Sequence, residues 1–543
     1  MLQIVRSCRS VLAGSAVFLM GGILLCLMAC KSSPKETLFF DTEDGSSAHD
    51  TTLVKASESS GGIDVKLIHQ EIGALCNRER SRFTSDKYVT HFYRNQNRLL
   101  WLDWYGVKAL ADTLLSRLER VGEHGLNSSF FFKDTIKADM SRVRSFSSNG
   151  MEEPNINQVI ARLEYHLTKS FLRYYVGQRY GFMQPWHVFN RLDPLKEDTV
   201  RHEVISYRQL FDVPLEHADS ASMAVLLNGL LEHGGITLML DSCETTIPFY
   251  KKMQEQLADR SLDRSRRQAL LCNMERLRWR KLLPDELQTK KQVVVNLAAL
   301  QLYAYSEDSV MKMKIACGSL KNKTPMLNST FKYIQLNPTW NIPYSIIKNE
   351  VTLHARDSAY FARNNYYIVN KESRAVEDVR SISSRMLQSG KYCVIQKGGE
   401  GNSLGRIIFR FDNNFSVYLH DTSNRQVFDR THRMVSHGCV RVQNPFGLLT
   451  YLVGEKDDWT MDKIRITVGL PPETERGMRY VEEMDEEDEE KTLISYLKIE
   501  DQVPLFITYF TVFPEENGQL EYFRDVYEYD KIMMEHLKPC CVF

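Results

Sequence analysis

The chain has 543 residues, of which 43% are hydrophobic and 25% are charged. That length has room for about two to four ordinary domains, and the composition is that of globular proteins rather than disordered or fibrous ones. The 69 basic and 69 acidic side chains give a formal net charge of zero, and no basic stripe stands out, so nucleic acid is not expected as a partner.

Residues 1–29 have the pattern of an export signal. Arg6 and Arg9 precede a nearly uncharged apolar run over residues 11–27, and small and apolar residues then lead up to Cys30. Such a run before a cleavage point is typical of exported proteins. The cysteine resembles the one in a lipobox, so we expect cleavage before Cys30 and acylation of its new N-terminus. An uncleaved membrane anchor is the alternative, although the run is short for a span.

Residues 30–62 are rich in Ser, Thr, Gly and acidic side chains. This composition buries too little apolar surface to fold, so we expect a flexible tether between the lipid and the folded body. The chain has 11 cysteines and no CxxC pair; Cys76, Cys243, Cys272, Cys317 and Cys393 lie far apart, and Cys540 and Cys541 are adjacent at the C-terminal end. A disulfide framework is therefore not indicated, and most of them are expected to be buried thiols.

Residues 63–285 show helical periodicity. Apolar side chains recur every three to four residues over 104–121 and 156–175, and the pattern continues through 250–279. No repeat of fixed period is visible. We interpret residues 63–285 as a helical scaffold domain without chemistry of its own.

Residues 286–535 are predicted to form a β-rich domain, which makes the fold class α+β. Short β-branched and aromatic runs, separated by Gly, Asn and Asp, indicate an antiparallel, β-sandwich-like architecture. The runs are residues 292–296, 300–305, 311–316, 333–336, 406–411 and 415–419.

Three further segments of this domain carry separate expectations. Residues 345–395, which begin with a helix-like stretch to residue 363, are expected to cap the sheet. Residues 476–500 are expected to form an acidic loop, whose acidic run could equally be a solvated helix surface. Residues 503–510 and 522–527 flank Asn-Gly and are expected to pair as a hairpin, which leaves 536–543 as a tail.

The candidate catalytic residues lie in segments 418–422 and 436–442. Cleavage of an amide needs a strong nucleophile, a base and donors for the developing oxyanion. A cysteine next to an imidazole can supply the thiolate, and histidine titrates near neutral pH. Gly438 allows a substrate carbonyl to approach the backbone closely, where the N–H groups of Gly438 and Cys439 could stabilise negative charge.

Two histidines could act as the base. His437 is two residues from Cys439, so the two side chains share a face in an extended chain. His420 lies further back, at a separation that suits two adjacent strands joined by a loop. The residues alone leave both possibilities open.

The spacing from His420 to Ser-His-Gly-Cys-x-Arg resembles the signature of the L,D-transpeptidase family (YkuD-type catalytic domain). The resemblance implies that Cys439 is the nucleophile, that His420 is the proton acceptor and donor, and that the backbone carbonyl of Asp421 orients the imidazole, so that the Asp421 side chain would matter little. The implied oxyanion and substrate-pocket residues are Gly438, His437, Ser436, Tyr418 and Arg441, with the Gly438 and Cys439 amides as oxyanion donors.

Further segments resemble the large, multidomain periplasmic subgroup of that family, which carries a helical scaffold. They are residues 92–101, 173–181, 273–279, 336–343 and 401–406. The resemblance covers about residues 70 to 530. One departure is the lack of a Gly-Asp-x-Gly-type peptidoglycan-binding repeat.

The resemblance implies a two-step exchange on peptidoglycan stem peptides. The thiolate attacks the bond between meso-diaminopimelate and D-alanine of a tetrapeptide, and an amine of a second stem then resolves the thioester into a diaminopimelate–diaminopimelate cross-link. No metal and no organic cofactor are expected. Carbapenem-type β-lactams should acylate the same thiolate. The protein would be a lipoprotein of a Gram-negative periplasm, attached through Cys30 to the outer membrane.

Other functions remain open at this point. Hydrolysis of the thioester would make the protein an L,D-carboxypeptidase, and a protein amine as acceptor would attach a lipoprotein to the wall. A non-catalytic lipoprotein that tethers peptidoglycan has no need of a thiol beside an imidazole. A metal site at His420, His432, His437 and Cys439 fits no common zinc spacing. Tyr418 could be a core aromatic, and Arg441 a structural ion-pair partner.

Overall fold

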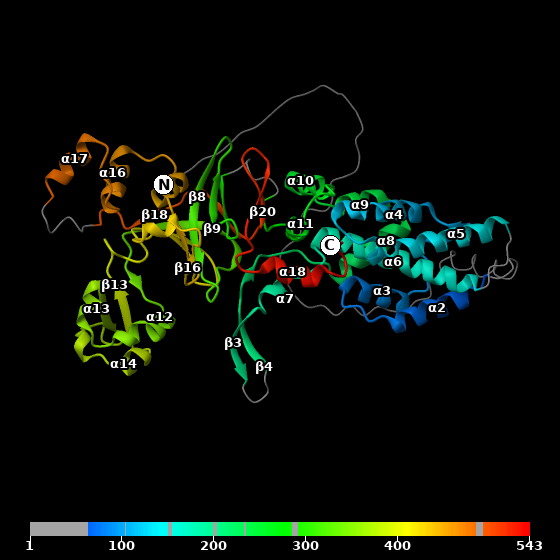
Figure 1. Ribbon diagram of the computed structural model, residues 1–543, viewed down its shortest axis with the longest axis horizontal. Coiled ribbons are helices and arrows are strands. Elements are labelled where there is room, and N and C mark those ends of the chain that lie inside the picture. The colour runs from blue at the N-terminus through cyan, green and yellow to red at the C-terminus, as the bar shows by residue number, and fades with distance from the viewer. Residues whose placement is uncertain are drawn as a thin grey trace, which may run out of the picture. The chain divides into compact units, whose positions relative to one another are not determined.

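Figure 1 shows the computed structural model of the chain. It describes residues 63–103, 105–149, 155–198, 203–232, 235–284, 291–484 and 492–542. The expected signal (1–29) and tether (30–62) lie outside the described residues, as does much of the acidic run. The unit from Leu53 to Phe543 is compact, and the description below is confined to it.

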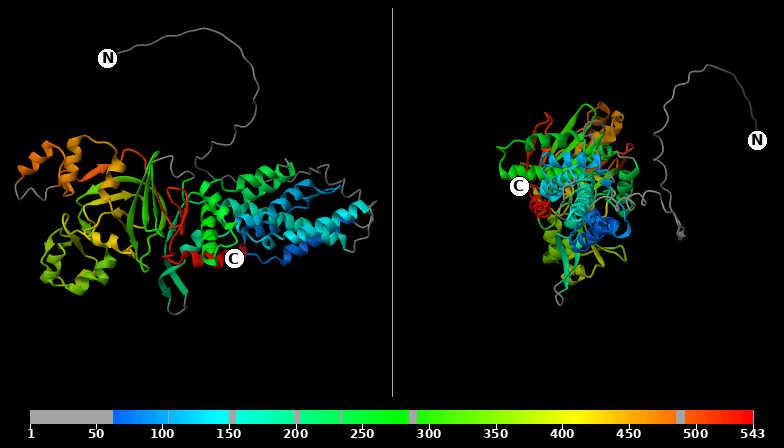
Figure 2. Two further views of the ribbon diagram at one scale, coloured as in Figure 1. Left: turned by 45° about the horizontal axis from the view of Figure 1, so that its top comes forward. Right: turned by 90° about the vertical axis from the view of Figure 1, so that its right-hand side faces the viewer.

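The region predicted as a scaffold is mainly helical, as the periodicity indicated. Its main helices are α2 (Val65–Arg78), α3 (Thr84–Asn95), α4 (Ala109–Glu119), α5 (Lys133–Asn149), α6 (Ile156–Tyr180), α8 (Ser220–Glu232), α9 (Ile236–Cys243), α10 (Pro248–Leu257) and α11 (Arg264–Arg278). The long helix α6 packs against α2, α3, α5 and α9. Figure 2 shows the blue and cyan helices of this region running alongside one another. Most of its residues are buried, because neighbouring helices cover it on several sides.

The scaffold region also contains strands that helical periodicity did not reveal. Strands β3 (Asp193–Asp198) and β4 (Glu203–Arg208) pair as an antiparallel hairpin after the short helix α7 (Pro185–Phe189). The two-residue strand β5 (Phe211–Asp212) then pairs in parallel with β9 (Met326–Leu336) of the following domain. A scaffold strand therefore belongs to the C-terminal sheet.

The C-terminal region is built on an 11-stranded sheet, with strand order β14-β15-β17-β8-β7-β6-β19-β9-β18 and with β16 and β5 paired to β8 and β9. The strands not yet defined are β6 (Gln292–Asn296), β7 (Gln301–Tyr305), β8 (Val310–Gly318), β14 (Ile407–Phe411), β15 (Leu419–His420), β16 (Met434–Ser436), β17 (Val440–Val442), β18 (Tyr496–Lys498) and β19 (Pro504–Thr508). Because β14 also pairs with β9, the sheet closes on itself like a barrel. The α+β class, with a helical part followed by a β-rich part, is confirmed.

The sheet is mixed rather than purely antiparallel. The pairs β15–β17, β16–β8 and β19–β6 are parallel. Parallel neighbours need a crossover connection, and the loops and helices between these strands supply it. Alternation of short runs in the sequence does not reveal strand direction.

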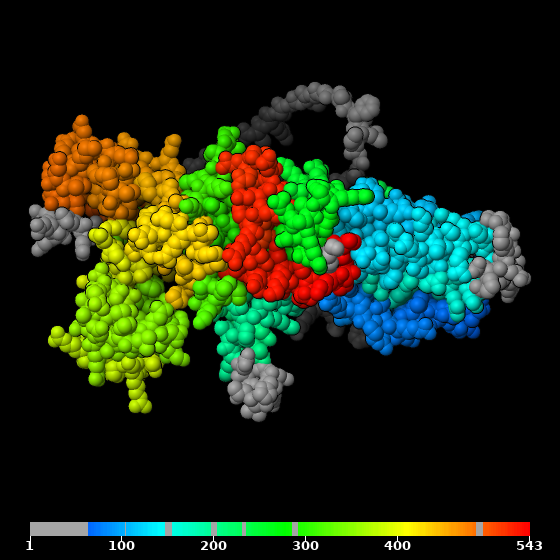
Figure 3. Space-filling view, in the orientation of Figure 1, coloured from blue at the N-terminus to red at the C-terminus, as the bar shows by residue number. Residues whose placement is uncertain are grey.

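The insertion expected over residues 345–395 has its own sheet and its own core. Its strands are β10 (Trp340–Asn341), β13 (Tyr392–Gln396), β11 (Tyr366–Asn370) and β12 (Val376–Glu377), in that spatial order. The expected helix over 345–363 is broken into α12 (Tyr344–Asn349), η3 (Val351–His354) and α13 (Ser358–Arg363), and α14 (Ser384–Gln388) follows. Its apolar side chains form a cluster separate from the main core. Figure 3 shows this module, hereafter the cap (residues 340–396), in yellow-green.

The C-terminal segments differ from the expected hairpin and tail. Strand β19 enters the main sheet between β6 and β9, and the hairpin is formed instead by β20 (Val512–Pro514) and β21 (Leu520–Tyr522). Helix α18 (Tyr529–Leu537) precedes Cys540 and Cys541, which are buried. The N–H of Asn127 donates to the Cys540 carbonyl at 2.8 Å, so the end of the chain packs against the scaffold.

Helices α15 (Pro445–Val453), α16 (Asp458–Thr467) and α17 (Glu475–Glu482) follow β17. Residues 476–500, expected as a loop, thus contain most of α17 and all of β18, with 485–491 outside the described residues. The cysteines that the structure describes are free thiols, and all except Cys393 and Cys439 are buried. Within the described ranges, no helix is both long and apolar enough to cross a bilayer.

Candidate active site

The predicted thiol and imidazole come from neighbouring strands that run in parallel. The register of β15 and β17 pairs His420 with Arg441, and the N–H of Val440 donates to the Tyr418 carbonyl at 3.1 Å. Side chains alternate along a strand, and register partners in a parallel pair point to the same face. Tyr418, His420, Cys439 and Arg441 therefore share one face of the sheet, as the proposed chemistry requires.

The loop that carries Cys439 wraps around the end of β8. Strand β16 pairs with β8 in parallel, strand β17 pairs with it antiparallel, and residues 437–439 connect the two. Gly438 has a φ of +125°, a backbone conformation that side chains with a Cβ rarely adopt. A Cβ there would meet only Val417, at 3.8 Å. The backbone conformation, rather than lack of space, thus requires glycine.

Ser436 holds this loop from inside. Its Oγ donates to the Cys439 carbonyl at 2.6 Å and accepts the Gly438 N–H at 3.1 Å. In the part of the chain that the structure describes, the Cys439 N–H bonds to no acceptor. Of the two amides expected to form the oxyanion hole, the Cys439 N–H is therefore the one left available.

The Cys439 thiol lies in a mixed environment. Its Sγ is 3.9 Å from the carbonyl oxygen of Ser416, the partner to which it donates. Burial raises the pKa of the thiol, while the backbone N–H and side chain of Tyr418 and the charges of Arg410 and Arg441 act in the opposite direction. The thiol is thus neutral at neutral pH, and the groups that favour its ionised form are already in place.

Tyr418 connects the thiol to the cap. Its ring packs 4.6 Å from the Arg410 guanidinium carbon. Burial raises the pKa of Tyr418, and its hydroxyl interacts with both Cys439 and Trp340 of strand β10. Tyr418 is therefore not simply a core aromatic, because its polar end lies at the candidate nucleophile.

His420 is buried, with 3% of its surface exposed. Burial first, and then the charge of Arg441, lower the pKa of His420 to about 3, and the backbone carbonyls of Asp421 and Leu404 oppose this shift. Within the described structure, His420 Nδ1 has no hydrogen-bond partner. The imidazole is neutral over the physiological range and can accept a proton.

The Asp421 side chain also has a structural role, which the resemblance did not imply. Its Oδ2 accepts the Arg406 N–H at 2.9 Å, and its Oδ1 lies 3.1 Å from Arg425 Nη2. A Cβ on Gly405 would lie 2.3 Å from Asp421 Cγ. This carboxylate fixes the turn before β14, so replacing it would disturb the turn next to His420.

His437 bridges the cap and the loop that carries the candidate nucleophile (residues 437–439, hereafter the nucleophile loop). It is exposed, and its Nε2 lies 3.0 Å from Oε1 of Glu350, which follows α12. Three residues that the sequence analysis did not predict as part of the site thus contact predicted site residues: Arg410, Trp340 and Glu350. Trp340 lies in a segment that resembles the family, whereas nothing in the sequence places Arg410 or Glu350 near Cys439.

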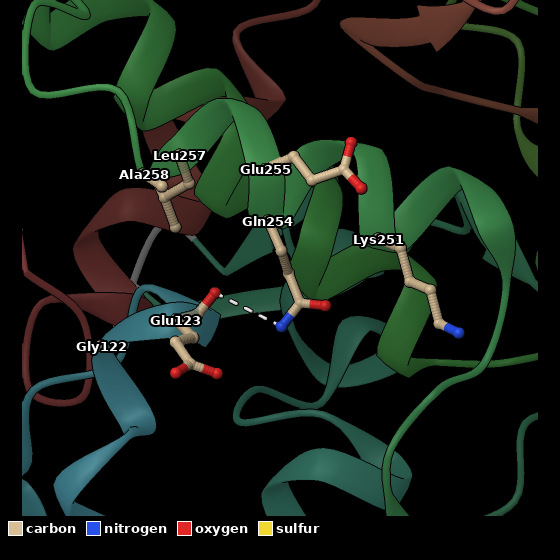
Figure 4. Close-up of a pocket in the computed structure, with 7 residues that line it drawn as sticks. All are labelled: Gly122, Glu123, Lys251, Gln254, Glu255, Leu257 and Ala258. Carbon is tan, nitrogen blue, oxygen red and sulfur yellow. Dashed lines mark hydrogen bonds between the residues drawn. The ribbon is translucent and has the colours of Figure 1, made fainter.

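A separate cavity of about 390 Å³ lies in the scaffold region, between α10 and the short helix η1 (Val121–His124). Its lining residues are Gly122, Glu123, Lys251, Gln254, Glu255, Leu257 and Ala258 (Figure 4). The Gln254 amide donates to the Glu123 carbonyl at 3.4 Å. None of the predicted site residues lines this cavity. Among the described residues, no three His, Cys, Asp or Glu side chains are gathered as a metal site would require.

Comparison with known families assigns both halves of the fold. Residues 290–464 match the L,D-transpeptidase catalytic domain, YkuD, and residues 87–257 match the Scaffold domain. The chain therefore carries a Scaffold domain followed by an L,D-transpeptidase catalytic domain of the YkuD type. The resemblance noted in the sequence is confirmed.

One curated relative is a Haemophilus influenzae protein whose own assignment as an L,D-transpeptidase is provisional. It is 28% identical over 270 residues, which cover 49% of this chain and 48% of the relative. The chain thus spans about half the length of the curated relative it matches.

Proposed function

We propose that this protein is a peptidoglycan L,D-transpeptidase that works through a Cys439 thioester. The observation that carries the proposal is the shared face of β15 and β17. It places a neutral imidazole, a thiol and an unbonded backbone N–H on adjoining backbone segments. Nucleophile, base and oxyanion donor are the three parts that acyl transfer from an amide needs.

In the first step, His420 takes the thiol proton as Cys439 attacks the carbonyl carbon of the diaminopimelate–D-alanine bond. The thiol donates to the Ser416 carbonyl in the structure, so the Cys439 side chain must turn toward the imidazole for this transfer. The Cys439 N–H stabilises the oxyanion. The C–N bond then breaks, the imidazolium returns its proton to the departing D-alanine amine, and a thioester remains.

In the second step, an amine of another stem attacks the thioester. His420 accepts a proton from the amine, the C–S bond breaks, and the thiol is regenerated after proton return. The charges of Arg410 and Arg441 act against the rise in the pKa of the thiol. The same charges can attract the carboxylates that stem peptides carry. No metal or organic cofactor takes part in this scheme.

The alternatives share the first step and differ in the acceptor. Water would give an L,D-carboxypeptidase, and a protein amine would attach a protein to the wall. A non-catalytic wall tether is disfavoured, because it needs no histidine kept neutral on the same face as a thiol. Carbapenem-type β-lactams should acylate Cys439, since they present a strained acyl group to the same thiolate.

We also propose the location from the sequence alone. The apolar run before Cys30 supports export and lipidation, with the folded body in the periplasm of a Gram-negative cell. Metabolic labelling with a palmitate analogue tests this, and label that persists in Cys30→Ala would contradict it.

The enzymatic proposal is tested with the full chain and purified disaccharide-tetrapeptides. The expected products are free D-alanine and dimers joined between two diaminopimelates, identified by chromatography and tandem mass spectrometry. Cys439→Ala should give neither. Tripeptide monomers without dimers would reassign the protein as a carboxypeptidase, and absence of any product would contradict the proposal.

A further inference from the structure

The carbonyl oxygen of Gly438 is bound by a side chain from outside the catalytic motif. Thr324 lies between β8 and β9, and its Oγ1 donates to the Gly438 carbonyl at 2.8 Å. Thr324 is fully buried, with 0% of its surface exposed. A buried hydroxyl in this position has no water to compete for its hydrogen, so the bond is strong and persistent.

The direction of that bond is fixed by a second one. Thr324 Oγ1 also accepts the N–H of Gly318, at 2.9 Å. A hydroxyl has a single hydrogen, and an N–H can only donate. The hydrogen of Thr324 therefore goes to Gly438, and the Gly438 carbonyl is the acceptor.

Tyr527 holds Thr324 in place from the C-terminal segment, beyond the part of the chain that matches the YkuD domain. Its hydroxyl accepts the Thr324 N–H at 3.2 Å and donates to the Gly318 carbonyl at 2.6 Å. A Cβ on Gly318 would lie 2.0 Å from the Asn322 carbonyl oxygen and 2.6 Å from the Thr324 nitrogen. The segment from Gly318 to Thr324 is thus packed too closely to shift easily.

The bond to Gly438 also determines where the Cys439 N–H points. The Gly438 carbonyl and the Cys439 N–H belong to one planar, trans peptide group, so they point in opposite directions. With the oxygen held by Thr324, the N–H is directed away from Thr324, and it is the donor that no described acceptor uses. A hydrogen bond to the carbonyl also polarises the amide and makes its N–H a better donor.

We propose that Thr324 is a positioning residue that orients the Cys439 N–H as the oxyanion donor, and that Tyr527 supports Thr324 in this role. The inference rests on the proposed function and extends it to two residues outside the motif. Neither residue touches substrate in this scheme. Thr324 and Tyr527 act on the direction and the donor strength of the peptide group between Gly438 and Cys439.

The test compares two reactions of the same thiol in the full-length protein. Acylation by the carbapenem meropenem forms an oxyanion, whereas alkylation by iodoacetamide displaces iodide at carbon and forms none. Thr324→Val removes the hydroxyl at nearly constant volume, and Thr324→Ser keeps it as the matched control. Both rates are followed by intact-mass spectrometry.

Acylation of Thr324→Val should fall by about tenfold or more, somewhat less than the loss known for deleting an oxyanion donor outright. Alkylation should stay close to the wild-type rate, and Thr324→Ser should restore acylation. Equal rates of acylation in wild type and Thr324→Val would overturn the inference. So would a parallel loss of both reactions, because that indicates general disturbance of the site.

If Thr324→Val does not fold, as judged by circular dichroism, Tyr527→Phe decides the question. It removes the hydroxyl that binds the Thr324 N–H, and it should slow acylation selectively and by a smaller factor. Unchanged acylation, or equal loss of both reactions, would overturn the inference. Failure of the wild type to acylate would instead contradict the proposed function and the inference with it, so the two failures are distinguishable.

Discussion

His420 and Arg441 are register partners in the parallel strands β15 and β17, so the imidazole and the guanidinium share one face of the sheet. After burial, the charge of Arg441 is the main cause that lowers the pKa of His420 to about 3. Burial at the same time raises the pKa of the Cys439 thiol. One face of the sheet therefore carries a neutral thiol and a neutral imidazole, not a preformed thiolate–imidazolium pair.

This charge state predicts the pH dependence of thiol alkylation. Only the thiolate reacts with iodoacetamide, and a thiol with a raised pKa gives about a tenfold rate increase per pH unit below that pKa. The rate for Cys439 should therefore rise steadily from pH 6 to 9, measured by intact mass with Cys439→Ala as the background control. A plateau near neutral pH would reveal a preformed ion pair and contradict the charge state described here.

The two histidines of the motif should differ sharply on replacement. His420→Ala removes the proposed base on the face of Cys439 and should slow acylation by at least about a hundredfold, the usual contribution of general base catalysis. His437→Ala removes an exposed contact with Glu350 and should have a much smaller effect. Single-turnover acylation by a β-lactam provides the measurement. The opposite order would make His437 the base.

Ser436→Ala should lower both stability and activity. It removes two hydrogen bonds inside the nucleophile loop, to the Cys439 carbonyl and from the Gly438 N–H. We expect a loss of about 1–3 kcal/mol in the free energy of unfolding, typical for buried polar groups left unpaired. Urea denaturation measures this loss, and Ser495→Ala serves as a serine control outside the nucleophile loop. Unchanged stability and acylation would show that these bonds do not hold the loop.

His166 should make the scaffold sensitive to acid. Its ring stacks on Phe132 at a centroid distance of 4.2 Å, and burial lowers its pKa to about 4. Because its unfolded pKa is about 6.5, the unfolded state binds the proton first as pH falls, so stability is lost between about pH 6.5 and 4.

The matched variant for this effect is His166→Gln, which cannot titrate. Relative to this variant, the wild type should lose about 1.4 kcal/mol in unfolding free energy for each pH unit within that window. Denaturant unfolding at pH 7, 5.5 and 4.5 gives the difference directly. A difference that is independent of pH would show that His166 is not buried in its neutral form.

Much of the architecture follows from local patterns in the sequence. The spacing of apolar residues predicts the long helix α6, because a helix that packs on several neighbours carries apolar residues along its whole length. The motif predicts that His420 and Cys439 lie on adjacent strands; His420 lies on β15, and Cys439 directly precedes its parallel neighbour β17. It does not predict that these strands are parallel, since direction depends on how the connections cross the sheet.

The supporting contacts of the site escape sequence analysis because they join distant segments. Thr324 meets Gly438, and Tyr527 meets Thr324, only because the fold brings the segment after β8 and the C-terminal segment together. The same holds for Glu350, which reaches His437 because the cap folds as a module with its own core. The sequence around each of these Thr, Tyr and Glu residues has no local pattern that indicates such a contact.

The most direct test of the central claim is intact-mass analysis of the full chain after exposure to a carbapenem, followed by peptide mapping of the adduct. The account predicts one covalent adduct, located on Cys439, absent from Cys439→Ala and formed far more slowly in His420→Ala. An adduct that persists in Cys439→Ala, or a wild-type protein whose mass does not change, would contradict it.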